Sequence, residues 1–358
     1  MALGSVALWT VVPAAVLWLI SRLSPSSQLS VSICPALAAG IPPTGDERLI
    51  EQRRNLMVPT VISDIPNRKG EDRPMSSHDP RSSTRPTVTA AQARRIIDAS
   101  VHFDVEGQVG ILTLDNPPSN QFTNDLVVDL AAAVDAAERA GLRALLVRGE
   151  GPNFCAGADV NIFNDVSVSE ARNMFSRNLP LLHRLENLPF PTVASVQGSC
   201  LAAGLELALA CDMIFAAESA QFSQVEARIG TATLLGGVQR ITERAGSARA
   251  KEIVFTADFY PAAKFLEWNI INRVYPDHEL AQASLDFVHR MAKGPTLAHH
   301  VTKRLVREYL DTGIRNADKM ILDAACPLFE SQDMQGGVKT LLKVGVANLL
   351  DHVTFEGK

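Results

Sequence analysis

Two glutamates stand out as candidate acid–base residues. Glu206 is the single charge inside an otherwise small and apolar stretch, QGSCLAAGLELALACD, which runs from Gln197 to Asp212. A buried carboxylate costs several kcal/mol unless it is paired or neutralised. Glu226 lies twenty residues further on, in AQFSQVEARIG. When two carboxyl groups share one apolar site, the pKa of one rises while the other stays ionised, so the pair supplies an acid and a base. Spacing alone leaves open that the two glutamates are unrelated, one reaching solvent and one starting a helix.

Two turns rich in small residues could stabilise a developing negative charge. NFCAGAD, from Asn153 to Asp159, follows a predicted strand, and GSCLAAG, from Gly198 to Gly204, leads from a strand into a helix. Backbone N–H groups at such turns are free donors, and a pair of them forms an oxyanion hole. The alternative is two ordinary strand-to-helix turns. The sequence has no GxGxxG, P-loop or GxSxG motif, so neither phosphate cradling nor a serine nucleophile is indicated.

Alternating strands and helices position these candidates. Strands separated by helical segments imply βαβ crossovers and a largely parallel, buried sheet. From 248 to 346 helical periodicity dominates, which predicts a helical subdomain or an oligomer contact. A helix followed by a strand could return Glu226 to the side of Glu206. The predicted elements are strands at 109–114, 142–147, 191–196 and 213–217, and a helix at 124–140 that Gly141 ends.

The composition excludes several classes of protein. The 358 residues are 46% hydrophobic and 20% charged, with a net charge of -5, so neither a nucleic-acid binder nor a disordered chain is indicated. The cysteines are odd in number and never spaced as CxxC, which favours a reducing compartment over disulfides or a zinc site. The adjacent pair His299 and His300 points in two directions on a helix and predicts no metal site. The cysteines are Cys34, Cys155, Cys200, Cys211 and Cys326.

The first hundred residues differ from the rest. We expect 1–100 to be a poorly ordered extension with one short apolar segment, 6–20. That segment is shorter than the roughly twenty residues that a spanning helix needs, and no basic residue precedes Arg22. Ala36-Leu37-Ala38 resembles a cleavage site, and Met75 could serve as an ordinary start. We therefore predict a cytoplasmic protein, with a membrane anchor through 6–20 as the alternative.

Taken together, FCAGADV, GSCLAAGLELALACD, AQFSQVEARIG and GGVQRI resemble the enoyl-CoA hydratase/isomerase (crotonase) superfamily. The resemblance runs from Val101 to Phe355. It implies the α/β ClpP/crotonase-like fold, with repeated ββα units and a C-terminal helical subdomain. It further implies that 101–255 is the crotonase core with the active site. Residues 256–358 would then be a helical part that takes part in oligomerisation, as a trimer or hexamer.

The resemblance also implies a role for each candidate. Ala158 supplies one oxyanion N–H, and Ala203 supplies the other at a position where the family usually has glycine. Glu206 orients and activates water, and Glu226 transfers a proton to or from the α-carbon, although these roles can be shared or exchanged.

Contacts to the substrate are implied as well. The resemblance assigns Ala156, Gly157 and Asp159 to the CoA thioester. The segment TATLLGG departs from the family's Pro-Gly-x-Gly-Gly turn and places Leu234 in the acyl and water pocket, where its side chain would reshape the space.

The predicted function is therefore that of an enoyl-CoA hydratase, which adds water across the 2,3 double bond of a 2-enoyl-CoA thioester. The substrate carries the CoA, and no resident cofactor or metal is implied. The alternatives are an enoyl-CoA isomerase or a specialised hydratase or lyase of the same fold, and a CoA-binding protein without turnover. These alternatives stay open because one fold can support many different reactions.

Overall fold

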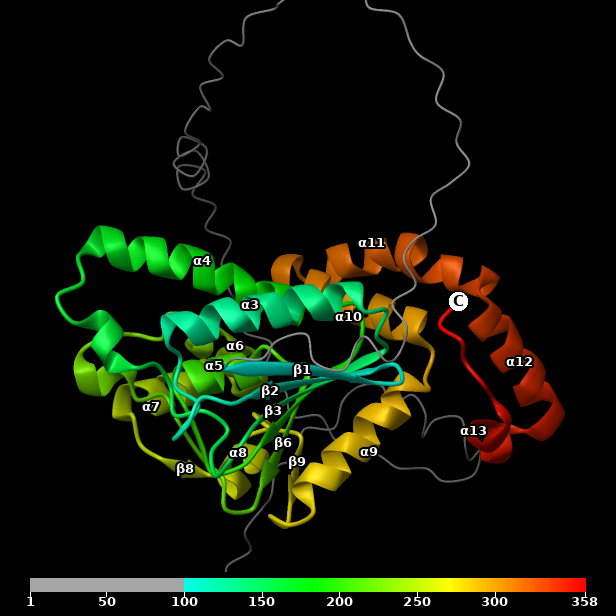
Figure 1. Cartoon of the computed structure of the whole chain (residues 1–358). Helices are drawn as coiled ribbons and strands as arrows, with labels where there is room; N and C mark the ends of the chain where they lie inside the picture. Colours follow the sequence, from blue (N-terminus) through cyan, green and yellow to red (C-terminus); the bar gives the residue numbers. More distant parts are fainter. Residues whose placement is uncertain (1–99) are drawn as a thin grey trace, which may run out of the picture. The chain divides into compact units, whose positions relative to one another are not determined.

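The computed structural model describes residues 100–358 (Figure 1). The predicted extension, with its apolar segment 6–20, the Ala36-Leu37-Ala38 site and Met75, lies outside the described residues, as does Cys34. Within the described part, no helix combines the length and the apolar character that crossing a membrane requires.

A six-stranded sheet forms the centre of the described unit, in the order β1-β2-β3-β4-β6-β9. Only the first pair is antiparallel; the other neighbours run parallel. Every residue of β2 and of β4 is buried, as expected for strands that are covered on both faces. The strands are β1 (Val101–Glu106), β2 (Val109–Leu114), β3 (Ala144–Gly149), β4 (Thr192–Val196), β6 (Met213–Ala217) and β9 (Arg273–Tyr275).

The chain repeats a ββα unit and so builds a second, smaller sheet. In the pairs β4–β5 and β6–β7 the first strand joins the large sheet, and the second strand joins a three-stranded sheet of order β5-β7-β8. β5 and β7 are parallel neighbours, and β7 pairs antiparallel with β8. The added elements are β5 (Ser199–Leu201), α5 (Ala203–Leu209), β7 (Gln221–Ser223), η4 (Glu226–Ile229), α6 (Gly237–Ala245) and β8 (Tyr260–Pro261).

Several predicted boundaries shift. α3 (Asn124–Arg139) ends one residue early, with Gly141 at a φ of 65°, and β3 begins at Ala144 rather than at Leu142. The strands of the small sheet are two or three residues long, too short to show a period of two, so sequence pattern missed them. β9 lies beyond 255 and extends the large sheet past the predicted end of the core.

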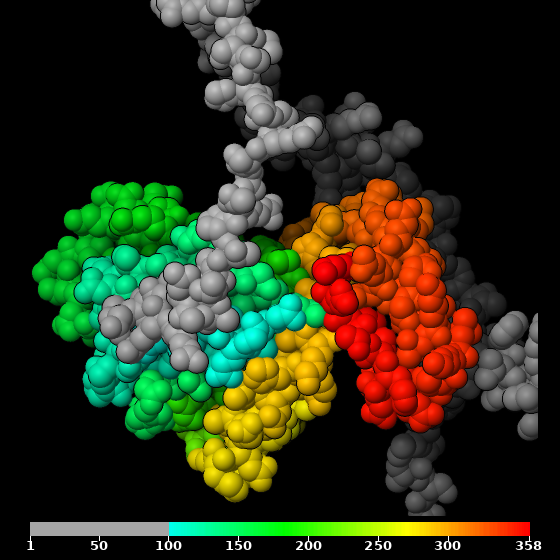
Figure 2. All heavy atoms as spheres, turned by 45° about the vertical axis from the view of Figure 1, so that its right-hand side comes forward, coloured from blue at the N-terminus to red at the C-terminus, as the bar shows by residue number. Residues whose placement is uncertain are grey.

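Helices dominate the C-terminal part. α9 packs on β3 and β4 of the large sheet, and the orange and red helices that follow gather on one side of the described unit (Figures 1 and 2). The remaining elements are η3 (Val160–Phe163), α4 (Val168–Glu186), α7 (Ser247–Thr256), α8 (Ala262–Glu267), α9 (Leu280–Ala292), α10 (Thr296–Thr312), α11 (Ile314–Ala325), η5 (Cys326–Glu330), α12 (Gln332–Val344), η6 (Val346–Asn348) and α13 (Leu349–His352).

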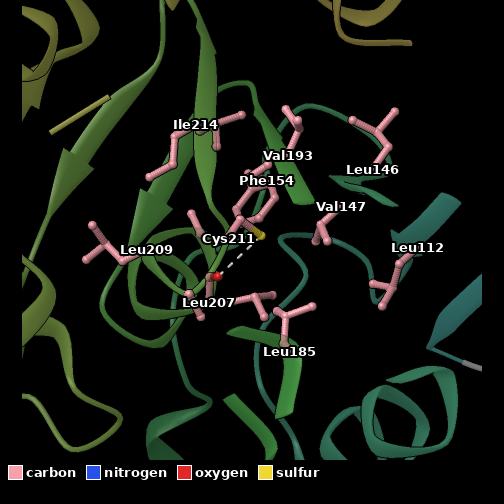
Figure 3. Close-up of a cluster of buried hydrophobic side chains, with 14 of the residues drawn as sticks. Leu112, Leu146, Val147, Phe154, Leu185, Val193, Leu207, Leu209, Cys211 and Ile214 are labelled. Carbon is pink, nitrogen blue, oxygen red and sulfur yellow. Dashed lines mark hydrogen bonds between the residues drawn. The ribbon is translucent and has the colours of Figure 1, made fainter. Parts of the chain in front are cut away.

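The hydrophobic core explains why a glutamate of α5 is buried. All seven residues of this helix are buried. Its Leu207 lies in a cluster with Val147 and Val193 of the large sheet (Figure 3). Cys211, just after the helix, donates its thiol to the carbonyl of Leu207 at 3.9 Å. Since α5 has no exposed face, Glu206 is held in the interior by its helix. The four cysteines of the described part are free.

Candidate active site

The small sheet brings the two glutamates together. Glu206 follows β5 and Glu226 follows β7, and these strands are parallel neighbours, so the chain leaves both at the same edge. Both carboxylates line one cavity of about 200 Å³. The residues that sequence spacing paired as a candidate acid and base therefore share a pocket.

Glu206 is held by backbone donors on one oxygen. Its Oε1 accepts the N–H groups of Leu235 and Gly237, both at 2.8 Å, while Oε2 accepts no hydrogen bond from the described residues. Burial raises the pKa of Glu206, and the two N–H groups together with Arg240 act against that rise. Oε2 is thus the oxygen available to a ligand in the cavity.

Glu226 is held differently. It is the first residue of η4 and is 9% exposed. Burial raises its pKa to about 7, and the nearby charge of Glu206 adds to the rise. In the amide orientation that satisfies both atoms of the carboxamide, the nitrogen of the fully buried Gln224 donates to the two oxygens of Glu226 at 2.8 and 3.0 Å. A carboxyl group with a pKa near neutrality can serve as an acid and as a base.

The N–H of Ala158 belongs to the first glycine-containing turn. Phe122 and Ala158 form an isolated parallel bridge, in which the Phe122 N–H binds the Gly157 carbonyl and the Asp159 N–H binds the Phe122 carbonyl. Because N–H directions alternate along extended backbone, the N–H of Ala158 points away from this bridge. Ala158 lines the cavity.

The second turn supplies Ala203, the first residue of α5. N–H groups in the first turn of a helix have no partner inside it. The preceding residue, Ala202, has a φ of 46° and a ψ of −121°, and its N–H donates to the Ser223 carbonyl at 2.9 Å. Both alanines line the cavity. The turn is thus anchored to β7, the strand that leads to Glu226.

The two turns are pressed against each other. The Leu201 N–H donates to the Cys155 carbonyl at 2.9 Å. A Cβ on Gly157 would lie 3.1 Å from the Cβ of Ala202, and one on Gly204 would lie 2.5 Å from the Cys155 carbonyl oxygen. Glycine at these two positions therefore lets the turns that carry Ala158 and Ala203 meet at the cavity.

Of the four residues that the sequence assigned to substrate contacts, two line the cavity and two do not. Ala156 and Leu234 line the cavity, and Leu234 is 38% exposed at its wall. Gly157 and Asp159 are not among the lining residues. The Asp159 carboxylate caps η3 by accepting the backbone N–H and side-chain amide of Asn161 at 3.0 and 2.8 Å.

Sequence reasoning missed the apolar wall and the donors behind Glu206. The wall comes from η3 and α4, whose Phe163 and Phe175 rings lie 6.4 Å apart, and no local pattern marks residues so far apart in the chain. Leu235 and Gly237 act through backbone N–H groups, which residue type does not reveal. Gln224 could have been found from the sequence, because it is a polar residue that directly follows a buried strand and lies two positions before Glu226.

The fold and the site define a crotonase-type enzyme, with two carboxylates and two glycine-containing turns at a largely apolar cavity. The family model for enoyl-CoA hydratase/isomerase matches residues 104–342, and the chain belongs to this family. The predicted crotonase superfamily and fold are confirmed. The relatives indicate a hydro-lyase of the crotonase type.

Three known proteins illustrate the likeness. A crotonyl-CoA hydratase of Syntrophomonas wolfei subsp. wolfei is 28% identical over 254 residues, 70% of this chain and 98% of that protein. An enoyl-CoA isomerase/hydratase of Mycosarcoma maydis is 32% identical over 194 residues, 53% of this chain and 70% of that protein. The structure of an enoyl-CoA hydratase subunit of Geobacillus kaustophilus is 29% identical with a TM-score of 0.68, covering 73% of this chain and 99% of that one.

Proposed function

We propose that the chain is an enoyl-CoA hydratase that adds water across the 2,3 double bond of a 2-enoyl-CoA. The observation that carries the proposal is the convergence of Glu206 and Glu226 on one cavity that Ala158 and Ala203 also line. Attack at the β-carbon moves charge onto the thioester oxygen, and two preorganised N–H donors stabilise the resulting enolate, each for about 3–4 kcal/mol.

The proposed division of labour follows from what holds each carboxylate. Glu206, whose Oε1 accepts two N–H groups that favour the ionised form against the effect of burial, would act as the base and take a proton from water through Oε2. Glu226, with its pKa raised to about 7, gives a proton to the α-carbon. In the reverse reaction the two roles exchange.

The acyl chain would lie along the apolar wall. Phe163, Phe175 and Leu234 all line the cavity. CoA enters as part of the substrate, and no resident cofactor or metal takes part in the proposed steps. Ala156, in the first turn, would contact the thioester.

Loss of enoyl-thioester absorbance, measured with a panel of 2-enoyl-CoAs of different length and branching, tests the proposal. Turnover with at least one member is expected, and the preferred member identifies the acyl group that the Leu234 side admits. No turnover with any member, but binding of acyl-CoA, would favour a CoA-binding protein without hydratase activity.

Double-bond isomerisation is the second candidate. The relative from Mycosarcoma maydis is named an isomerase/hydratase, and a carboxyl group with a pKa of about 7 can shuttle a proton between two carbons. Bond migration in 3-enoyl-CoAs without hydration of 2-enoyl-CoAs would favour this candidate over the first.

The proposal includes an acyl-CoA as the binding partner and the cytoplasm as the compartment. The substrate class is acyl-CoA, and the net charge of -5 gives no support to a nucleic-acid partner. The four described cysteines are free, and three of them are buried, which supports the cytoplasm as the place of action.

A further inference from the structure

Arg240 of α6 is a buried cation directly behind the loop that holds Glu206. The residue is 6% exposed. Its Nη1 donates to the carbonyl oxygens of Leu235 at 2.9 Å and of Gly236 at 3.3 Å. Its Nε and Nη2 donate to the carboxylate of Glu186 at 3.2 and 2.9 Å. The guanidinium therefore binds the active-site loop on one side and the end of α4 on the other.

One peptide unit connects Arg240 with Glu206. The carbonyl of Gly236 accepts hydrogen bonds from the Arg240 side chain and, at 3.2 Å, from its backbone N–H. The N–H of the same peptide unit, which belongs to Gly237, donates to Glu206 Oε1 at 2.8 Å. In a trans peptide these two groups point in opposite directions. A cation on the carbonyl polarises the unit and strengthens the bond that its N–H makes.

The two glycines of the loop leave room for close contacts on both of its sides. Gly236 has a φ of 92°, and a Cβ there would lie 2.1 Å from Arg240 Nη1. A Cβ on Gly237 would lie 2.4 Å from the Gln224 carboxamide and 3.0 Å from Glu206 Cγ. Side chains at these positions would displace the guanidinium on one side and the Gln224 carboxamide and the Glu206 side chain on the other.

A second arginine provides a matched control within the chain. Arg307 of α10 approaches Glu186 as well, with its Nη2 2.6 Å from Oε2. Burial raises the pKa of Glu186, but Arg240 and Arg307 together hold it below its ordinary value. Among the described contacts Arg307 pairs only with Glu186, whereas Arg240 also holds the loop. Loss of either arginine disturbs the same ion pair, and only loss of Arg240 frees the loop.

We propose that Arg240 is a positioning residue for the hydration step: it orients the Leu235–Gly237 loop so that two N–H groups hold Glu206 Oε1 and leave Oε2 directed at water. The inference rests on the proposed hydratase function for its catalytic consequence and on the loop geometry for its structural one. Arg240 touches neither water nor acyl group in this scheme.

Steady-state kinetics of three variants test the role. Arg240→Gln should lower kcat about 10- to 100-fold with KM changed much less, since a loosened carboxylate costs rate rather than affinity. Arg240→Lys, which keeps the charge but has a single donor nitrogen, should recover part of kcat. Arg307→Gln should stay within about threefold of the unaltered chain. Equal losses in Arg240→Gln and Arg307→Gln would overturn the proposal, because they would reduce Arg240 to a general ion-pair role.

The pH dependence of kcat/KM distinguishes a positioning role of Arg240 from a purely structural one. The charge of Arg240 from α6 favours the ionised form of Glu206, and the charge of Glu206 in turn raises the pKa of Glu226 from η4, which faces the same cavity. Loss of the Arg240 charge favours the protonated form of Glu206. The acid limb of kcat/KM, which requires ionised Glu206, should therefore move to higher pH in Arg240→Gln and stay in place in Arg307→Gln. An unmoved limb in Arg240→Gln would count against the proposal.

A titration without substrate separates this proposal from the proposed function. Isotope-edited NMR of the glutamate carboxyl groups, with Glu206 assigned through Glu206→Gln, should show its titration displaced to higher pH in Arg240→Gln and little displaced in Arg240→Lys. If the chain hydrates no enoyl-CoA but this displacement occurs, the hydratase proposal fails and the positioning role stands. If the titration of Glu206 is the same in all folded variants, the positioning role fails.

Discussion

At the scale of single residues, the two catalytic candidates differ in what surrounds each carboxylate. Glu206 is more deeply buried but receives two backbone N–H groups and lies near a buried guanidinium. Glu226 receives a neutral amide and has a pKa raised to about 7. Unequal surroundings are what allow two identical side chains to act as a base and an acid.

Glu206→Gln and Glu226→Gln should each lower kcat by about 10²- to 10⁴-fold, because each removes one proton transfer from the reaction. Stopped assays with the preferred enoyl-CoA measure the loss, and circular dichroism serves as the control for folding. The double variant should be little worse than the poorer single variant, since the pair acts as a unit. Near-normal turnover in either single variant would refute the assigned roles.

Activity should also depend on the proton of Glu226. Its pKa is raised from the ordinary 4.5 to about 7, so the protonated acid persists to neutrality and is lost above it. We expect kcat/KM for hydration to fall as pH rises through about 7, with the slope of a single proton. The limb should disappear from the much lower profile of Glu226→Gln. A profile that rises through this range would mean that the ionised form of Glu226 is the active one.

At the scale of elements, the turn between β5 and α5 stores strain next to the proposed oxyanion hole. Ala202 has a φ of 46° with a ψ of −121°, a conformation that glycine adopts far more readily. A hydrogen bond from the Ala202 N–H to the Ser223 carbonyl and close packing against Gly157 hold the residue in this conformation. Strain of this kind persists where surrounding contacts determine the backbone, and it directs the next N–H, that of Ala203.

Ala202→Gly should therefore raise the free energy of unfolding by about 1 kcal/mol, the strain relieved less the entropy that glycine adds to the unfolded chain. Ala203→Gly is the matched control at the next position. Ala203 is the first residue of a helix, and glycine there should destabilise by up to about 1 kcal/mol. Urea unfolding measures both. An Ala202→Gly chain no more stable than Ala203→Gly would show that the turn is not strained.

At the scale of the whole described unit, buried charges fasten the C-terminal end to the large sheet. Arg143, just before β3, donates to the carbonyls of Gly294 and Phe355 at 2.5 and 2.9 Å and to Thr296 Oγ1 at 2.6 Å. Asp333 of α12 accepts the N–H groups of the last residues, Glu356 and Gly357, at 2.6 and 2.9 Å.

Arg143→Met should lower the free energy of unfolding by about 1–3 kcal/mol, because it leaves two partly buried carbonyl groups without these donors. Arg148→Met is the control, since Arg148 bonds only to Thr113 Oγ1 among the described contacts, at 3.0 Å. Limited proteolysis should release C-terminal fragments faster from the Arg143 variant. Equal stability of the two variants would show that the tail is held by other contacts.

The same C-terminal helices expose many apolar side chains, and we expect them to meet other copies of the chain in a trimer or hexamer. Exposed apolar surface of this extent marks interaction sites. Light scattering on the full chain measures its mass. Leu322→Lys should reduce the mass, while Val128→Lys, at an exposed position of α3, should not. A monomer would refute the expectation. The exposed residues include Leu310, Ile314, Leu322, Phe329 and Leu342.

The sequence by itself determined the family and the order of the candidate residues along the chain. An isolated glutamate in a buried apolar helix, a second one twenty residues on, and two glycine-containing turns after strands identified the family and six of the residues that line the cavity. These signals are local: burial, charge and turn geometry each depend on residues near in sequence. Asp159 was assigned to the substrate by position in a motif, whereas its side chain caps η3.

The tertiary structure alone decided how the site is held. The pairing of β5 with β7, which joins the two acids, involves strands too short to show a periodic pattern. The donors to Glu206 are backbone N–H groups, and the cation behind them, Arg240, reaches the loop from one turn along α6. The apolar wall comes from α4, far from both acids in sequence. The strand pairing and the apolar wall depend on contacts between segments far apart in the sequence, which no local pattern encodes.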